Sequence, residues 1–236
     1  PLVSGEGIRR MTSAGIKVVS GILKKEGREV NKRFLSRIEK GRPYIILKWA
    51  QSADGFVAGE NGRQVSISNK ISQNYSHKLR FTEDAIMVGT NTVINDNPKL
   101  TNRYGKGKNP LRISMDFNNR LKKQCHLLEG TVPTIIYNSY LNEKNRELDF
   151  VKIDKNTFNL NMILQDLAER EINSLIVEGG PTLLNQFISA KLYDEVHVFE
   201  SPTKLQNGLK SPDFELKNAQ KTKLLKQDRY YFFKIN

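Results

Sequence analysis

The chain has 236 residues, enough for one large α/β domain whose core needs no disulfide bonds. No apolar run comes near the ~20 residues that a membrane-spanning helix requires, so we expect no membrane partner. Cys125 is the only cysteine, which excludes an internal disulfide and favours a reducing, cytoplasmic location. The first five residues show no signal-peptide pattern, and the absence of an initiator Met is compatible with a fragment of a longer protein.

The net charge of +13 is concentrated near the start of the chain. Twelve Lys or Arg residues and three Glu residues lie between Arg9 and Lys48, and Phe34 is the only aromatic residue of this stretch before Tyr44. Sites for single-stranded nucleic acid interleave aromatic side chains with basic ones, and this segment does not. We therefore expect a solvated helical face or a surface for anionic ligands, and no nucleic-acid partner.

A helix is predicted over 29–38, where apolar residues recur at helical spacing. It ends at Gly41-Arg42-Pro43, because the residue before a proline disfavours the helical conformation. We place the main internal boundary here, between a leading segment, 1–42, and a larger domain, 43–236.

Beyond this boundary, short apolar runs alternate with amphipathic segments. The runs predict strands at 44–50, 85–88, 111–115, 134–137, 174–178, 196–199 and 230–233. The amphipathic segments predict helices at 69–81, 160–172 and 182–192, the first with Ser68 as its N-cap. Strands that alternate with helices and are apolar throughout indicate an α/β fold with a central sheet covered on both faces. The closing strands favour a mixed sheet.

Residues 178–182 form the most informative local motif, Glu-Gly-Gly-Pro-Thr. A buried strand ends in an acid, two glycines allow a close backbone approach, and a helix begins at once. The free N–H groups of a helix N-terminus bind anions, and ligands of α/β proteins lie at this edge of the sheet. A plain turn with Pro181 as the first helical residue explains the motif equally well. The sequence contains neither G-x-G-x-x-G nor a P-loop.

Three further polar features are weak when taken singly. Lys48 lies inside an apolar strand, where it is either functional or an outward-facing residue. Asp96 falls in Asn95-Asp96-Asn97-Pro98, a turn sequence in which Asx-turn residues are common. The three histidines are scattered without metal-ligand spacing, so no metal is expected, and His77 is predicted to lie on a helix surface.

Three blocks together carry a family resemblance. Residues 43–55 (PYIILKWAQSADG) resemble the opening strand of the reductase (C-terminal) domain in the riboflavin-biosynthesis bifunctional deaminase–reductase family. Residues 85–101 and 176–183 are similar to its second and third blocks, in the same order. The resemblance covers 43–236, and 1–42 resembles the family's connector and the tail of its deaminase domain.

The resemblance implies a dihydrofolate-reductase-like mixed sheet flanked by helices on both faces, with NADPH as the hydride donor. It implies reduction of 5-amino-6-(5-phosphoribosylamino)uracil to the ribitylamino compound. The residues that match the catalytic positions are Lys48, Asp96 and Glu178. Those that match substrate positions are Gln64, Arg80, Leu100 and Arg103, of which the two arginines would hold the phosphate. Those that match coenzyme positions are Ala50, Ser66, Thr92, Gly179, Gly180, Pro181, Thr182, Leu183 and Leu184.

The sequence departs from the family in two places. Ser66 stands where family members commonly have a tryptophan beside the nicotinamide, and Gln64 lies in an unusual loop. The H-x-E and P-C-x-x-C motifs of a zinc deaminase are absent, so the protein as given is not itself the deaminase.

Two alternatives stay open: a reductase of this fold that acts on another heterocycle, and a basic, non-catalytic binding module on a degenerate reductase fold. Members of the family usually form dimers or larger assemblies, so the resemblance implies a homo-oligomer.

Overall fold

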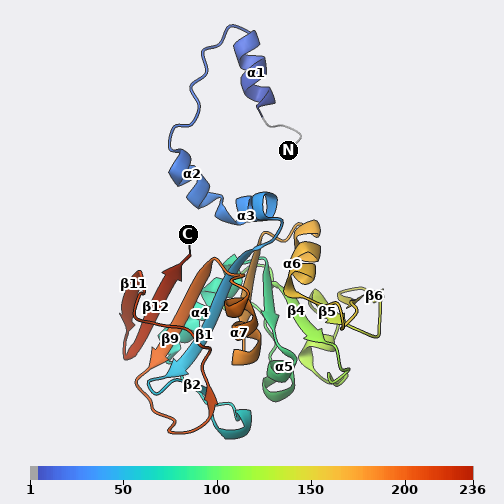
Figure 1. Cartoon of the computed structure of the whole chain (residues 1–236), viewed down its shortest axis with the longest axis vertical. Helices are drawn as coiled ribbons and strands as arrows, with labels where there is room; N and C mark the ends of the chain where they lie inside the picture. Colours follow the sequence, from blue (N-terminus) through green and yellow to red (C-terminus); the bar gives the residue numbers. More distant parts are fainter. Residues whose placement is uncertain (1–4, 236) are drawn as a thin grey trace.

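The computed structural model describes residues 5–235, and expectations about residues 1–4 lie outside this range. A ten-stranded sheet has the order β11-β12-β9-β1-β8-β3-β4-β5-β7-β6 (Figure 1). Its strands are β1 (Tyr44–Ser52), β3 (Ala85–Val88), β4 (Leu111–Asp116), β5 (Thr134–Asn138), β6 (Glu143–Asn145), β7 (Leu148–Lys152), β8 (Ser174–Glu178), β9 (Glu195–Ser201), β11 (Lys221–Leu225) and β12 (Asp228–Lys234). A small second sheet pairs β2 (Phe56–Ala58) with β10 (Leu209–Lys210).

The large sheet is mixed, as predicted. The strands from β9 to β7 run parallel to their neighbours, whereas β12 pairs with β9 in the antiparallel sense. The two outermost strands, β11 and β6, are also antiparallel to their neighbours. The central strands β1, β8 and β3 therefore end at one edge, where their polar end residues meet.

Helices cover both faces of the sheet, as the sequence predicts. Along each central strand the side chains alternate between the two faces, and the core divides accordingly. Met87 and Val177 face α6 (Leu160–Glu169) and α7 (Pro181–Ser189) in one cluster. On the other face, Ile86, Val88 and Ile176 form a second cluster with residues of α4, α5 and the 3-10 helix η2, whose bounds are α4 (Lys70–Thr82), α5 (Thr90–Asp96) and η2 (His126–Leu128).

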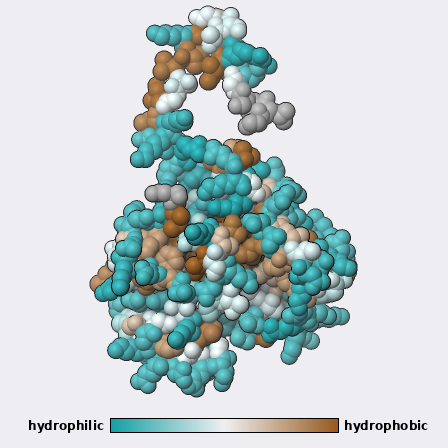
Figure 2. Space-filling model, viewed as in Figure 1, coloured by the Kyte–Doolittle hydropathy of each residue, from teal (hydrophilic) through white to brown (hydrophobic). Residues whose placement is uncertain are grey.

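The leading segment forms an arm that projects from the sheet (Figure 1). It contains α1 (Glu6–Ser13), α2 (Lys24–Val30) and α3 (Lys32–Lys40). The helix predicted over 29–38 is interrupted at Asn31, whose side chain donates to the Gly27 carbonyl and ends α2. Apolar side chains of the arm stay exposed, with 81% for Val30, and Figure 2 shows them gathered along it.

The positive charge of α3 is used to attach the arm to the sheet. Lys32 Nζ lies 2.7 Å from an oxygen of Glu195, and Arg33 makes two hydrogen bonds to the buried Glu83. Arg42, just after the helix, is paired with Asp194 in the same way. These carboxylates lie at the edge of the sheet opposite the strand ends described below. Much of the basic run therefore has partners within the protein, and the expectation of a solvated face is wrong for these residues.

Two local predictions need correction. The N-cap of α4 is Asn69 instead of Ser68, because the Asn69 side chain accepts hydrogen bonds from the backbone of Ile71 and Ser72. Asp96 is the last residue of α5 instead of part of a turn, and the backbone turns one residue later at Asn97, with a φ of 39°. Over residues 5–235, no helix is both long and apolar enough to cross a bilayer.

Candidate active site

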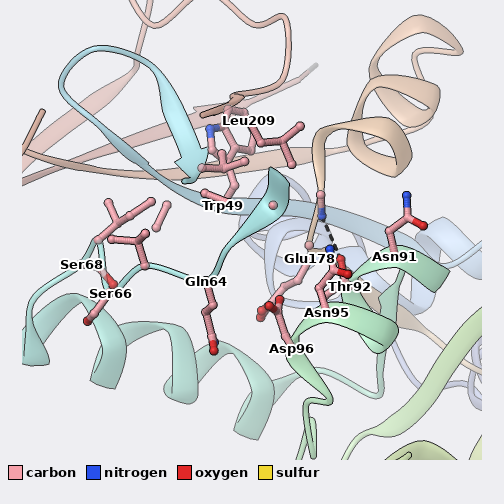
Figure 3. A pocket seen from close by; sticks show the side chains of 18 of the residues that line it. Trp49, Gln64, Ser66, Ser68, Asn91, Thr92, Asn95, Asp96, Glu178 and Leu209 are labelled. Carbon is pink, nitrogen blue, oxygen red and sulfur yellow. Dashed lines mark hydrogen bonds between the residues drawn. The ribbon is translucent and has the colours of Figure 1, made fainter. Parts of the chain in front are cut away.

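A cavity of ≈ 610 Å³ opens where β1, β8 and β3 end, a size within the ~300–1,000 Å³ range of ligand pockets. Figure 3 shows its lining, which comes mainly from β1, the end of β8, α5 and the segment between β2 and α4. Nine of the predicted site residues line it: Lys48, Ala50, Gln64, Ser66, Thr92, Asp96, Glu178, Gly179 and Gly180. Sequence positions far apart are thus brought together by the pairing of parallel strands.

The charged side chains of Lys48 and Glu178 line the cavity, and Arg80 pairs with Glu178 from outside the lining. In the parallel register Leu47 lies beside Val177, so Lys48 and Glu178 are neighbours one step further along β1 and β8. Lys48 Nζ lies 3.5 Å from a Glu178 carboxylate oxygen. Arg80, from α4, donates to both oxygens of the same carboxylate at 3.2 and 2.8 Å. One buried carboxylate therefore serves two cations.

This arrangement lowers the pKa values of both Glu178 and Lys48, for different reasons. Burial alone would raise the pKa of Glu178, but Arg80 and Lys48 outweigh it and bring the pKa to about 2. Burial lowers the pKa of Lys48, and Arg80 adds to this, while Glu178 compensates only in part. Glu178 therefore stays ionised, and the Lys48 ammonium gives up its proton more readily than an exposed lysine does.

Gly179, Gly180 and Thr92 form a cradle beside this cluster. The Gly180 N–H donates to Thr92 Oγ1 at 3.1 Å, the bond drawn in Figure 3. A Cβ on Gly179 would lie 2.6 Å from the same oxygen, and the φ of Gly179 is +109°. Pro181 is the first residue of α7, so the backbone N–H groups of Thr182 and Leu183 have no partner within the helix. A coenzyme phosphate fits this helix end, and the bare glycine backbone allows its close approach.

Replacing Gly179 with Ala should weaken coenzyme binding about 100-fold, because the new Cβ meets Thr92 and the backbone conformation is strained. Coenzyme fluorescence on titration measures this directly. Gly27 is the control, since it lies in α2, outside the cavity lining, and a Cβ there would meet nothing within 4 Å. Equal losses in the two alanine variants would contradict the cradle.

Asp96 and Gln64 line the cavity from different segments of the chain (Figure 3). Asp96 comes from the end of α5, and partial burial raises the pKa of its carboxyl. Gln64 and Ser66 belong to the segment that follows the 3-10 helix η1 (Glu60–Gly62), and both are exposed. The only tryptophan of the sequence, Trp49, lines the cavity from β1. Its indole is buried in the first core cluster, edge-on to Phe214, and Ser66 occupies the position where the family resemblance leads us to expect a tryptophan.

The remaining predicted site residues lie outside the lining. Leu100 is buried in the second core cluster, and Arg103 is exposed on the loop that follows. Leu183 and Leu184 point into the first core cluster, and with Pro181 and Thr182 only their backbone belongs to the helix end.

Several lining residues were missed by the sequence analysis: Gln73, Asn91, Asn95, Ile67, Ser68, Val57 and Leu209. Asn91 and Asn95 are four residues apart on α5, and this helical spacing could have indicated that both face the cavity. His77 also needs correction, since it is half-buried with a fully buried Nδ1 atom instead of lying on the helix surface. Among residues 5–235, no group of His, Cys, Asp or Glu could hold a metal ion.

A mixed sheet with helices on both faces and a glycine-lined cleft at its central strand ends defines an α/β domain of dihydrofolate-reductase-like fold. Dihydrofolate reductase from Enterococcus faecalis shares this fold, with a TM-score of 0.50 and 12% identity over 81% of this chain and 95% of that one. The chain belongs to the RibD C-terminal domain family, whose model matches residues 43–227.

Relatives that align over nearly the full length agree with this assignment. Riboflavin biosynthesis protein RibD from Aquifex aeolicus is 36% identical over 99% of this chain and 69% of its own length. A deaminase/5-amino-6-(5-phosphoribosylamino)uracil reductase structure from Thermotoga maritima has a TM-score of 0.86 and 26% identity, covering 99% of this chain and 68% of that one. The chain therefore spans about two thirds of each of these relatives.

Proposed function

We propose that this protein reduces 5-amino-6-(5-phosphoribosylamino)uracil to its ribitylamino form, with NADPH as the electron donor. The observation that carries the proposal is that Lys48 and Glu178, which pair with each other and with Arg80, line the same cavity as the Gly179–Thr92 cradle. Family membership supports the reductase chemistry, since the Thermotoga maritima relative is named for reduction of this uracil. The E. faecalis enzyme, solved with NADP(H), supports a nicotinamide coenzyme on this fold.

When bound, the nicotinamide supplies a hydride to the first carbon of the sugar. As that C–H bond forms, the electron pair of the imine or carbonyl double bond in the ring-opened sugar moves to the heteroatom, which takes up a proton. The proton can come from Lys48, whose lowered pKa favours release, or from Asp96, whose raised pKa keeps a larger share protonated. Glu178, ionised at neutral pH, accepts hydrogen bonds from sugar hydroxyls and holds Lys48 in place.

The direct test is NADPH oxidation with the deaminated pyrimidine ribosyl phosphate as substrate. Turnover of this compound, with none of dihydrofolate, supports the proposal. Turnover of dihydrofolate would favour the reductase of another heterocycle. Tight, salt-dependent binding of RNA or DNA without coenzyme affinity would favour the non-catalytic alternative.

Replacing Asp96 with Asn should lower kcat about 100-fold, because the amide keeps the size of the carboxyl but cannot exchange a proton. Steady-state NADPH oxidation measures the change. Asp213→Asn provides the control, since it makes the same change at an exposed residue outside the cavity lining and should leave kcat unchanged. Unchanged turnover in the Asp96 variant would remove it from the chemistry.

We also propose how the chain divides into segments. Residues 43–236 form the reductase domain, and 1–42 form a connector and the tail of a deaminase domain. The arm supports this division, since neither α1 nor α2 contains a buried residue. We further propose that the protein is cytoplasmic, on the basis of its single cysteine. We also propose that it forms a homo-oligomer, as members of the family usually do. Light scattering of the purified protein tests the oligomer.

A further inference from the structure

One face of α4 is turned toward the cavity and carries three polar side chains. Gln73, His77 and Arg80 follow the i, i+4, i+7 pattern, so they lie in a row along the same side of the helix. Gln73 lines the cavity, and Arg80 donates to Glu178, which lines it as well. His77 therefore lies between two residues of the site, although neither the family resemblance nor the cavity lining includes it.

His77 has an unusual hydrogen-bonding state. Its Nδ1 atom is buried and has no hydrogen-bond partner, a condition shared within residues 5–235 only by Oδ1 of Asp228. The burial of Asp228 has a structural explanation, because its other oxygen, Oδ2, accepts hydrogen bonds from the Asn69 N–H and the Ser72 hydroxyl. Unpartnered buried polar atoms are rare in folded proteins, and each one calls for an explanation.

The surroundings of His77 favour a neutral ring. Burial lowers the pKa of the ring, Arg80 and Arg103 lower it further, and the opposing effect of Glu178 is smaller than these. Lys48 also lowers this pKa. Because the buried Nδ1 has no acceptor beside it, a hydrogen on Nε2 avoids burying an unpaired N–H. The geometry at Nδ1 therefore favours Nε2 as the donor of the neutral ring.

A donor of this kind is useful because the nearby arginines are only partly available. Arg80 uses Nε and Nη2 for Glu178, which leaves Nη1 for a ligand. Arg103 is exposed on a loop, so it loses side-chain freedom when it binds. The neutral N–H of His77, held on a helix, can donate a further hydrogen bond to an anion. It adds no charge to a region that already contains the cations Lys48, Arg80 and Arg103.

We propose that His77 is a third residue of the anion site formed with Arg80 and Arg103, and that its Nε2–H donates to the phosphate of a phosphorylated sugar substrate. The chemical identity of the ligand rests on the proposed function, whereas the placement of His77 does not. His77 acts in substrate binding and not in the transfer of the hydride or the proton.

The test compares His77→Gln, His77→Asn and His77→Leu in the 236-residue chain, by calorimetric titration with D-ribose 5-phosphate. Gln carries its amide nitrogen at the distance of Nε2, and Asn carries it at the distance of Nδ1. We expect Gln to bind within ~3-fold of the wild type, and Asn and Leu to bind ~10- to 100-fold more weakly, the usual cost of a lost hydrogen bond to a charged group. In turnover, KM for the phosphorylated substrate should rise by the same factor while kcat stays unchanged.

Lys78→Met is the matched control, because Lys78 is the exposed neighbour of His77 and carries a full charge. It should bind the sugar phosphate as the wild type does. D-ribose without its phosphate should bind equally to the wild type and all His77 variants. The comparison of Gln with Asn remains decisive even if the leucine variant fails to fold.

The inference and the proposed function can fail separately. Wild-type binding by the Asn variant, or equal losses in Gln and Asn, overturns the role of Nε2. If the uracil substrate is turned over and KM is unaffected in these variants, the function stands and the inference is wrong. If ribose 5-phosphate binds through His77 but the uracil is not reduced, the inference stands and the function is wrong.

Discussion

Replacing Lys48 with Met should lower kcat about 10³-fold and at the same time leave the fold as stable as before, or more stable. The ammonium is a candidate proton donor in contact with the reacting atoms, and general acids contribute roughly 10²- to 10⁴-fold. Stability should not fall, because Arg80 alone still satisfies both oxygens of Glu178. Met fills a similar volume and removes the cost of burying a second cation.

Urea unfolding followed by circular dichroism measures the stability, and NADPH oxidation measures kcat. Lys152→Met is the control, because Lys152 ends β7 at the same edge of the sheet but is exposed. It should change neither quantity. A Lys48 variant that lost activity only in proportion to lost stability would show that Lys48 is structural.

The sequence predicts the central strands well because they are buried on both faces. A strand between two helical layers is apolar throughout, and the prediction over 174–178 matches β8 residue by residue. The edge strands β6 and β11 were missed for the opposite reason. Nearly all their residues are exposed, so their composition is polar, and only pairing with a neighbouring strand makes them extended.

The site could be predicted only in part, because its geometry depends on strand order. Lys48 and Glu178 are 130 positions apart, and each alone has an ordinary structural explanation. They meet because β1 lies between β8 and β9, which no local pattern reveals. The partner of Arg80 and the buried Nδ1 of His77 also depend on how α4 is rotated against the sheet, and helical spacing alone does not fix that rotation.

Replacing Glu178 with Gln should have the opposite effect on stability from the Lys48 variant. Removing the shared carboxylate leaves two buried cations without a counter-charge, which costs about 3–5 kcal/mol of the free energy of unfolding. The wild-type pKa of about 2 lies below the ordinary value of 4.5, so the carboxylate stabilises the fold above pH 4.5 and this contribution is lost as the pH falls toward 2. The difference in stability between wild type and variant should therefore be full at pH 7 and shrink below pH 4.5.

The same variant should change the pH dependence of the reaction. Glu178 raises the pKa of Lys48 against the effects of burial and Arg80, so its removal lowers that pKa further. If Lys48 acts as the proton donor, kcat/KM will then begin to fall at a lower alkaline pH than in the wild type. Glu83→Gln is the matched control, since Glu83 is equally buried and paired with Arg33 far from the cavity. It should cost stability and leave the pH profile unchanged, whereas an alkaline limb that stays in place in the Glu178 variant would exclude Lys48 as the acid.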